Sequence, residues 1–66
     1  MVVVFIITTN NPEKVYNAMR LANVAVSKGD EVNVFMLGEA VLFEQIKDER
    51  FNVMEQINQY KGNMYV

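Results

Sequence analysis

The sequence predicts an α/β domain in which a parallel sheet is built from a strand, a helix, a strand, a helix and a strand, in that order. Three segments carry this prediction: an apolar run at Val2–Ile7, a capped amphipathic helix that starts at Pro12, and a second apolar run at Val32–Leu37. Two strands joined by a helix through short connections form a βαβ unit. Its strands are parallel and its crossover is almost always right-handed.

The first strand is predicted at Val2–Ile7, where β-branched and aromatic residues follow one another without interruption. The run is too short for a typical helix. Because it lacks the polar alternation of a strand with one wet face, we expect it to be buried on both faces. The polar turn Thr8–Asn11 follows it.

A helix is predicted to begin at Pro12, because Asn11 is a good N-cap and proline is favoured at the first helical position. Apolar side chains then recur at intervals of three and four residues, at Val15, Ala18, Met19, Ala22, Ala25 and Val26. Gly29 provides the left-handed residue that ends the helix.

The second half of the chain is predicted to hold two helical segments and a third strand. A short helix is expected at residues 40–47, with Val41, Leu42 and Ile46 on its inner side and an interruption at residues 48–50. Asn52, with Glu55 three residues later, is a variant of the capping box. The second helix then has Met54, Ile57 and Tyr60 at helical spacing, Gly62 ends it, and a strand starts at Asn63 or Met64.

The chain has 66 residues, which permits one small domain. Domains of this size bury only about 60% of their unfolded surface, so their cores are marginal without further support. The sequence contains no cysteine and no histidine, which excludes a disulfide framework and the usual structural zinc sites. We therefore expect a homo-oligomer. Because the sequence stops within the third strand, we also expect residues 1–66 to be the first half of a longer domain.

The charges predict an ordinary surface. Six basic and eight acidic residues give a net charge of −2, and the two signs are interspersed. No basic stripe indicates nucleic acid, and the apolar run at Met1–Ile7 is too short to span a bilayer. We expect a cytoplasmic protein with no membrane or nucleic-acid partner and no cofactor.

The best positional candidate for a ligand site is the turn formed by Thr8, Thr9, Asn10 and Asn11. It connects the carboxyl end of a strand to a helix N-terminus, where free backbone N–H groups attract anions. The loop at Gly38 and Glu39 follows the neighbouring strand and completes the candidate site. The turn lacks the glycines of phosphate and dinucleotide loops, and its side chains serve equally well as helix caps.

Other polar or soft side chains have structural interpretations. The carboxylates of Glu39, Glu44, Asp48 and Glu49 are interspersed with basic residues, which favours a solvated surface over a cation site or an acid pair. Flexible thioethers at Met19, Met36 and Met54 fill gaps in a small core. Tyr16 and Tyr60 are expected to be half-buried, or to mark a subunit contact. No catalytic or metal-binding residue is identifiable.

Four segments together resemble the DsrE/DsrF-like sulfur-relay family: the helix end at Ala25–Gly29, the strand at Glu31–Phe35, the loop at Gly38–Val41 and the final Gly62–Val66. The resemblance implies a three-layer α/β/α domain with five parallel strands in the order 4-3-2-1-5, assembled into trimers or hexamers. It also implies a persulfide-bearing cysteine in the loop after the third strand. No residue of this sequence matches that cysteine.

The strand order implied by this resemblance has a further consequence. If strands one, two and three lie side by side, right-handed crossovers place both intervening helices on the same face of the sheet and leave the other face bare. The apolar side chains of the first strand would then need cover from more of the domain or from other subunits.

Two classes of function follow. The first is a persulfide-carrying subunit of an intracellular sulfur relay that works with a partner protein. The second is a noncatalytic ligand-binding or oligomeric assembly module of the same fold. A flavodoxin-like phosphate binder is a third alternative, which the glycine-free first turn disfavours.

Overall fold

The computed structural model describes all 66 residues, Met1–Val66. It contains the predicted order of elements, with one 3₁₀ helix where a short α-helix was expected. The elements are β1 (Val2–Ile7), α1 (Pro12–Ser27), β2 (Glu31–Met36), the 3₁₀ helix η1 (Gly38–Gln45), α2 (Val53–Gln59) and β3 (Asn63–Tyr65). No helix combines the length and the apolar character that crossing a bilayer requires.

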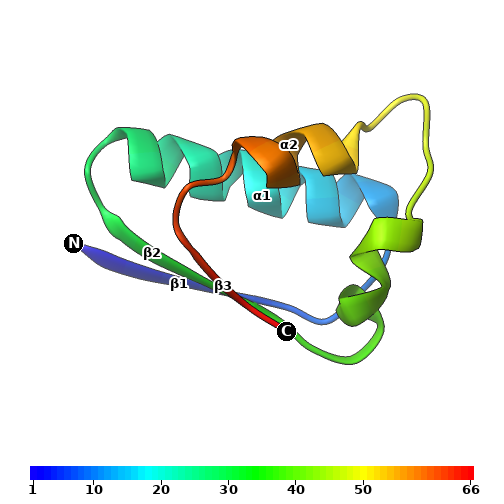
Figure 1. Cartoon of the computed structure of the whole chain (residues 1–66), viewed down its shortest axis with the longest axis horizontal. Coiled ribbons are helices and arrows are strands. Elements are labelled where there is room, and N and C mark those ends of the chain that lie inside the picture. Colours follow the sequence, from blue (N-terminus) through cyan, green and yellow to red (C-terminus); the bar gives the residue numbers. More distant parts are fainter.

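The three strands form one parallel sheet in the order β1-β2-β3. Val2 lies opposite Glu31 at one end of the β1–β2 pair, and Ile7 lies opposite Met36 at the other. The helices α1 and α2 both lie on the same face of this sheet (Figure 1). The prediction of a parallel β-α-β-α-β sheet with both helices on one face is therefore confirmed. The 66 residues form two layers, so the third layer of the expected α/β/α arrangement is not present in this structure.

The core lies between the sheet and the two helices. Its largest fully buried side chains are Met19 and Met36. The buried set consists of Ile7, Val15, Met19, Ala22, Val32, Val34, Met36, Ala40 and Val53. Because Ala22 is small, α1 approaches the strands closely where this residue faces them.

Both ends of α1 have the predicted caps. The side-chain oxygen of Asn11 accepts a hydrogen bond from the backbone N–H of Lys14 at 3.1 Å, and Pro12 occupies the first turn. Beyond the other end, Gly29 has a φ of +88°, a conformation that costs glycine little and other residues much more. The bounds of α1 are therefore specified by local sequence.

The prediction that β1 is buried on both faces is wrong for this chain. Val3, Phe5 and Ile7 point toward the helices, whereas Val2, Val4 and Ile6 are 63%, 54% and 65% exposed. The reason is the one-sided helix layer, since successive side chains of a strand point to opposite faces.

The predicted inner side of the segment at residues 40–47 is also wrong in part. Val41 and Leu42 are exposed, whereas Ala40 is buried and Phe43 and Ile46 are partly buried. Ala40 and Phe43 lie on either side of a kink at Leu42, and Ile46 is the extended residue that follows η1, so the expected regular helix over residues 40–47 does not describe which side chains face the core.

Two smaller differences concern α2. Val53 is its buried residue, and Met54 is only half-buried. The helix ends at Gln59, where Tyr60 is already extended, rather than at Gly62. The predicted cap is confirmed, because the side-chain oxygen of Asn52 accepts a hydrogen bond from the backbone N–H of Glu55 at 3.0 Å.

Polar contacts fix α2 against α1. The amide nitrogen of Asn23 donates to the backbone carbonyl oxygen of Gln56 at 2.9 Å and to its side-chain oxygen at 3.0 Å. Near the start of this pair of helices, the rings of Tyr16 and Phe51 lie 5.5 Å apart. The half-buried position expected for Tyr16 and Tyr60 is confirmed.

Candidate functional site

The turn after β1 and the loop after β2 lie side by side at the carboxyl edge of the sheet. The backbone N–H of Leu37 donates to the carbonyl of Ile7 at 2.9 Å. A Cβ atom placed on Gly38 would lie 3.6 Å from the carbonyl oxygen of Thr8. The fold thus brings together the two segments that the sequence singled out, Thr8–Asn11 and Gly38–Glu39.

Two of the four polar side chains in the turn stabilise the turn itself. The hydroxyl of Thr9 accepts a hydrogen bond from the backbone N–H of Asn11 at 3.1 Å, and Asn11 caps α1. Thr8 and Asn10 are exposed, as are Gly38 and Glu39. Glu13 places a carboxylate in the first turn of α1, where it offsets the positive end of the helix dipole. The edge therefore offers a few exposed polar groups beside a capped and partly neutralised helix end.

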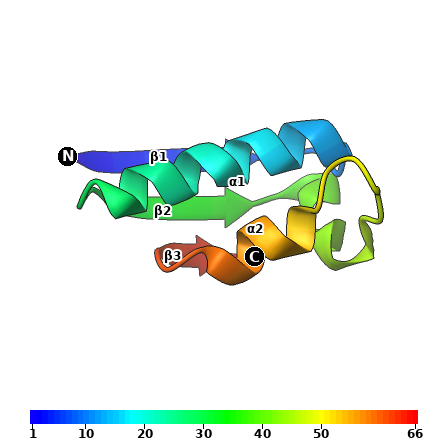
Figure 2. The same ribbon diagram turned by 90° about the horizontal axis from the view of Figure 1, so that it is seen from above.

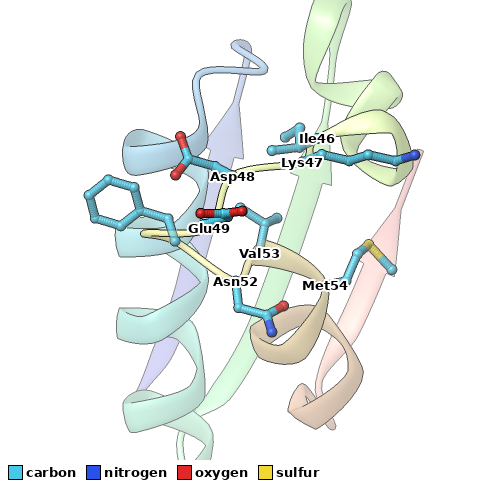
Figure 3. Close-up of a pocket in the computed structure, with 8 residues that line it drawn as sticks. Ile46, Lys47, Asp48, Glu49, Asn52, Val53 and Met54 are labelled. Atoms are coloured by element: carbon cyan, nitrogen blue, oxygen red, sulfur yellow. The ribbon is translucent and has the colours of Figure 1, made fainter.

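A hollow of about 450 Å³ lies elsewhere, between η1 and α2. One continuous stretch lines it, and Figure 3 shows most of that stretch as sticks. The lining residues are Ile46, Lys47, Asp48, Glu49, Phe51, Asn52, Val53 and Met54. None of the residues predicted for the ligand site belongs to this lining. The sequence offered no signal for the hollow, because it arises where the chain turns from η1 into α2.

Two of the four charged side chains at residues 47–50, Asp48 and Arg50, are paired within one short turn. The carboxylate of Asp48 accepts hydrogen bonds from the backbone N–H of Arg50 at 2.8 Å and from its guanidinium at 3.2 Å and 3.3 Å. These hydrogen bonds lower the pKa of Asp48 and raise the pKa of Arg50. The guanidinium also lies 5.5 Å from the centre of the Phe51 ring. Asp48 is therefore a structural acceptor in this turn.

The chemistry available at these places is limited. No group of three or more acidic side chains is arranged so that it could hold a metal ion. The carboxylates of Glu39, Glu44, Asp48 and Glu49 therefore do not form such a site. The hydroxyl of Ser27 donates to the backbone carbonyl of Val24 at 2.7 Å, so it is engaged within α1. The sequence contains no histidine and no cysteine, so neither place has an imidazole base or a thiol nucleophile.

The third surface is the face of the sheet that carries no helix, and we call it the bare face (Figure 1). It consists of Val2, Val4 and Ile6 on β1, Glu31, Asn33 and Phe35 on β2, and Asn63 and Tyr65 on β3. This surface was predicted from the handedness of the crossovers. Its internal contacts were not predicted.

The side chains of the bare face form ordered cross-strand rows. The rings of Phe35 and Tyr65 stack with centroids 4.9 Å apart and planes inclined by 19°. One row away, the side-chain amide of Asn63 donates to the side-chain oxygen of Asn33 at 3.1 Å. Ile6 is paired with Phe35 in the sheet register, so it extends the aromatic row onto β1. The bare face is therefore mainly apolar, with Glu31 as its only charged side chain.

No protein-family model matches this chain, and no curated protein and no solved structure matches it either. We therefore infer its function from the three surfaces described above.

Proposed function

We propose that this chain is a noncatalytic assembly module whose bare face packs against a second apolar layer of protein. The observation that carries the proposal is the exposure of Val2, Val4 and Ile6 along one whole strand. A second layer on this face would produce the three-layer α/β/α arrangement that the resemblance to DsrE/DsrF-like proteins implies. A homo-oligomer, either a trimer or a hexamer by the same resemblance, is the form of assembly that we propose.

The free energy available on the bare face is large for a domain of this size. Full burial of one valine or isoleucine side chain contributes about 1.5–3 kcal/mol. The three exposed residues of β1 therefore offer several kcal/mol, which is comparable with the entire stability of a small domain at about 5–15 kcal/mol. Covering this face would stabilise the chain substantially.

The polar residues of the bare face are satisfied only in part, because the NH2 group of Asn33, the side-chain oxygen of Asn63 and the hydroxyl of Tyr65 make no side-chain hydrogen bond within the chain. The amide of Asn63 is already bonded to Asn33, so covering the pair leaves that bond intact. Burying a polar group is costly mainly when its hydrogen bond remains unmade. The charged residue Glu31 lies at one end of β2, at the margin of the face. The side chains of Val2, Val4 and Ile6 are thus suited to a dry contact, whereas a covering layer must supply polar partners beside Asn33 and Asn63.

Sedimentation velocity, combined with binding of a dye that fluoresces on apolar surfaces, tests this proposal. We expect the wild-type chain to form species larger than the 7.6 kDa monomer, and we expect F35K to shift it toward the monomer. L42K is the matched control, because Leu42 is an exposed apolar residue on η1, away from the sheet face. A wild-type monomer that unfolds cooperatively and binds no dye would contradict the proposal.

We propose sulfur relay as a second function, for a polypeptide that continues beyond β3. It is supported by the register of β3, which pairs Phe35 with Tyr65 in parallel. A segment that follows Tyr65 would leave the sheet at its carboxyl edge, where the Thr8–Asn11 turn and Gly38 lie. A cysteine in that segment would carry the persulfide and pass it to a partner protein.

The reading frame of the source gene tests this second function. We expect a cysteine within a few codons after Val66, and intact-mass spectrometry of the full product should show one added sulfur atom after incubation with a persulfide donor. A frame that ends at Val66 or continues without a cysteine excludes sulfur transfer by this protein and leaves the assembly function.

A further inference from the structure

The two edges of the sheet differ in how well they are protected against pairing with another strand. Sheet edges are commonly protected by short strands, charged side chains or prolines. The edge strand β3 has three residues, whereas β1 has six, all of them apolar and none of them proline. Figure 2 shows β1 as the outermost strand on the side opposite β3. The edge of β1 has none of these protections.

The hydrogen bonds to β2 show which backbone groups of β1 are free. The N–H of Glu31 donates to the carbonyl of Met1 at 3.0 Å, and the N–H of Leu37 donates to the carbonyl of Ile7 at 2.9 Å. In a parallel pair of strands, the backbone groups of alternate residues bond to the neighbouring strand. The backbone N–H and C=O groups of the odd-numbered residues of β1 therefore point toward β2. The N–H and C=O groups of Val2, Val4 and Ile6 therefore point outward, away from the sheet.

These same three residues have their side chains on the bare face. Their backbone groups and their side chains are thus both without a partner in the chain. A strand added beside β1 would satisfy the backbone groups and bring its own side chains alongside the three apolar ones. In the three-stranded sheet no strand lies on the outer side of β1.

The flank of α1 above this edge has an apolar centre at Leu21, and Lys14 and Lys28 lie seven residues before and after it on the same side of the helix. Asn23 faces α2 through its bond to Gln56, and α2 lies toward β3 (Figure 2). Leu21 is about 160° around the helix from Asn23, at 3.6 residues per turn, so it lies on the flank toward β1. Leu21 is 54% exposed, and Ala18 and Ala25 lie beside it on the same flank.

We propose that the free edge of β1 pairs with β1 of a second copy of this chain. The pairing is antiparallel, about a two-fold axis that passes beside Val4 and runs perpendicular to the sheet. Val4 faces Val4 of the second copy, Val2 faces Ile6, and Ile6 faces Val2. Directly opposed residues with outward backbone groups exchange two N–H···O bonds per pair. The product is one six-stranded sheet with both helix layers on the same side.

Two observations favour a second copy over an unrelated strand. The free groups on residues 2, 4 and 6 are symmetric about Val4, as a two-fold interface requires, and β1 carries no charged side chain that would meet its own copy. In addition, α1 packs on both β1 and β2. Adjacent strands lie about 4.8 Å apart, so the two α1 helices would lie about 10 Å apart, which is a normal packing distance. Leu21 and the two alanines would form that contact.

This inference concerns the edge of the sheet, so it goes beyond the proposed use of the bare face. Disulfide trapping tests it, since the natural sequence contains no cysteine. In the proposed register the two copies of residue 4 have Cα atoms about 5.5 Å apart, within the range of a disulfide. The two copies of residue 2 are offset by four residues, or about 14 Å, which is too far.

We expect V4C to form a covalent dimer under mild oxidation at least about tenfold faster than V2C, in line with these distances. V2C is the matched control, because Val2 lies on the same strand and is equally exposed. An equimolar mixture of V2C and I6C should form the mixed dimer in preference to either homodimer. Sedimentation of the wild-type chain should show reversible species that contain an even number of copies, either the dimer itself or the hexamer.

Equal rates for V4C and V2C, or a mixture of V2C and I6C that pairs at random, would overturn the proposed pairing. If the wild-type chain is then still larger than a monomer, assembly through the bare face stands and only the edge pairing fails. A monomeric wild-type chain would overturn both. Circular dichroism of each variant shows whether the fold is retained, and a cross-link formed in the predicted register is itself evidence of folded β1 strands.

Discussion

The hydroxyl of Tyr60 lies 3.1 Å from the backbone carbonyl oxygen of Val32 and links the end of α2 to the central strand. The same hydroxyl lies 2.8 Å from the carbonyl oxygen of Asn63, at the start of β3. One phenol thus connects the end of α2 with both β2 and β3. Its ring is half-buried, and burial raises its pKa above the ordinary value of 10.0.

The stability of the chain should fall at high pH because of Tyr60. Its neutral form is favoured in the folded chain, so this contribution is present below the unfolded pKa and is lost as pH rises through the folded pKa. The free energy of unfolding, measured by urea denaturation at a series of pH values, should decline above about pH 10. Y60F should be less stable at neutral pH and should show a smaller decline. Equal pH profiles for the two proteins would show that Tyr60 makes no such contribution.

Gly62 is expected to be required because of its contact with Tyr60. A Cβ atom at position 62 would lie 2.6 Å from Cζ of the Tyr60 ring, whose single hydroxyl proton is shared between the carbonyl oxygens of Val32 and Asn63. G62A should therefore cost about 1–3 kcal/mol through overpacking. In a Y60A background the same substitution should cost little, as measured by a double-mutant cycle.

G29A is the control for this cycle. Its cost comes from the left-handed backbone at Gly29, with open space around the site, so it should be the same with Tyr60 or with alanine at position 60. A cost of G62A that does not depend on Tyr60 would show that the ring can move aside.

The capping role of Asn11 can be separated from ligand binding. N11A removes the acceptor of the Lys14 N–H bond and should destabilise the chain by about 1 kcal/mol. N10A, at the exposed neighbouring position, should change stability by less than about 0.5 kcal/mol. Thermal unfolding of both variants tests this expectation. Similar losses for the two variants would indicate that the turn depends on Asn10 as much as on the cap.

The two methionines at Met19 and Met54 should differ in importance. Met19 is fully buried between α1 and the sheet, so M19A should cost about 2–5 kcal/mol from lost contacts and a residual cavity. Met54 is half-buried beside the open hollow, so M54A should cost only about 1 kcal/mol. Denaturant unfolding curves give both values. A larger loss for M54A would mean that the hollow is closed by packing in solution.

Much of the fold was predictable because its signals are local. The side chains of Asn11 and Asn52 accept hydrogen bonds from backbone N–H groups three residues later, and Gly29 adopts the positive φ found just after the end of α1. These signals give the bounds of α1 and the start of α2. The pairing of Asn33 with Asn63 and the stacking of Phe35 on Tyr65 were not predictable, since they depend on the register of strands far apart in the sequence.

The candidate site, like the fold, could be predicted only in part from the sequence. The sequence identified Thr8–Asn11 and Gly38–Glu39 because carboxyl ends of parallel strands meet at one edge, and the structure places these segments side by side. Their role in ligand binding remains a prediction. The hollow at residues 46–54 was not predicted, because it arises where the chain turns from η1 into α2.

The sequence by itself determined the order of strands and helices, their caps and the parallel connection of β1 to β2, because these depend on residue types within a few positions of each other. Only the tertiary structure decided which set of alternate side chains of β1 is exposed. Val3 and Val4 are the same residue type in the same apolar run, and only Val3 faces the helices. Their difference arises because both helices pack on one face, so alternate side chains and alternate backbone groups of a single strand are left for a partner.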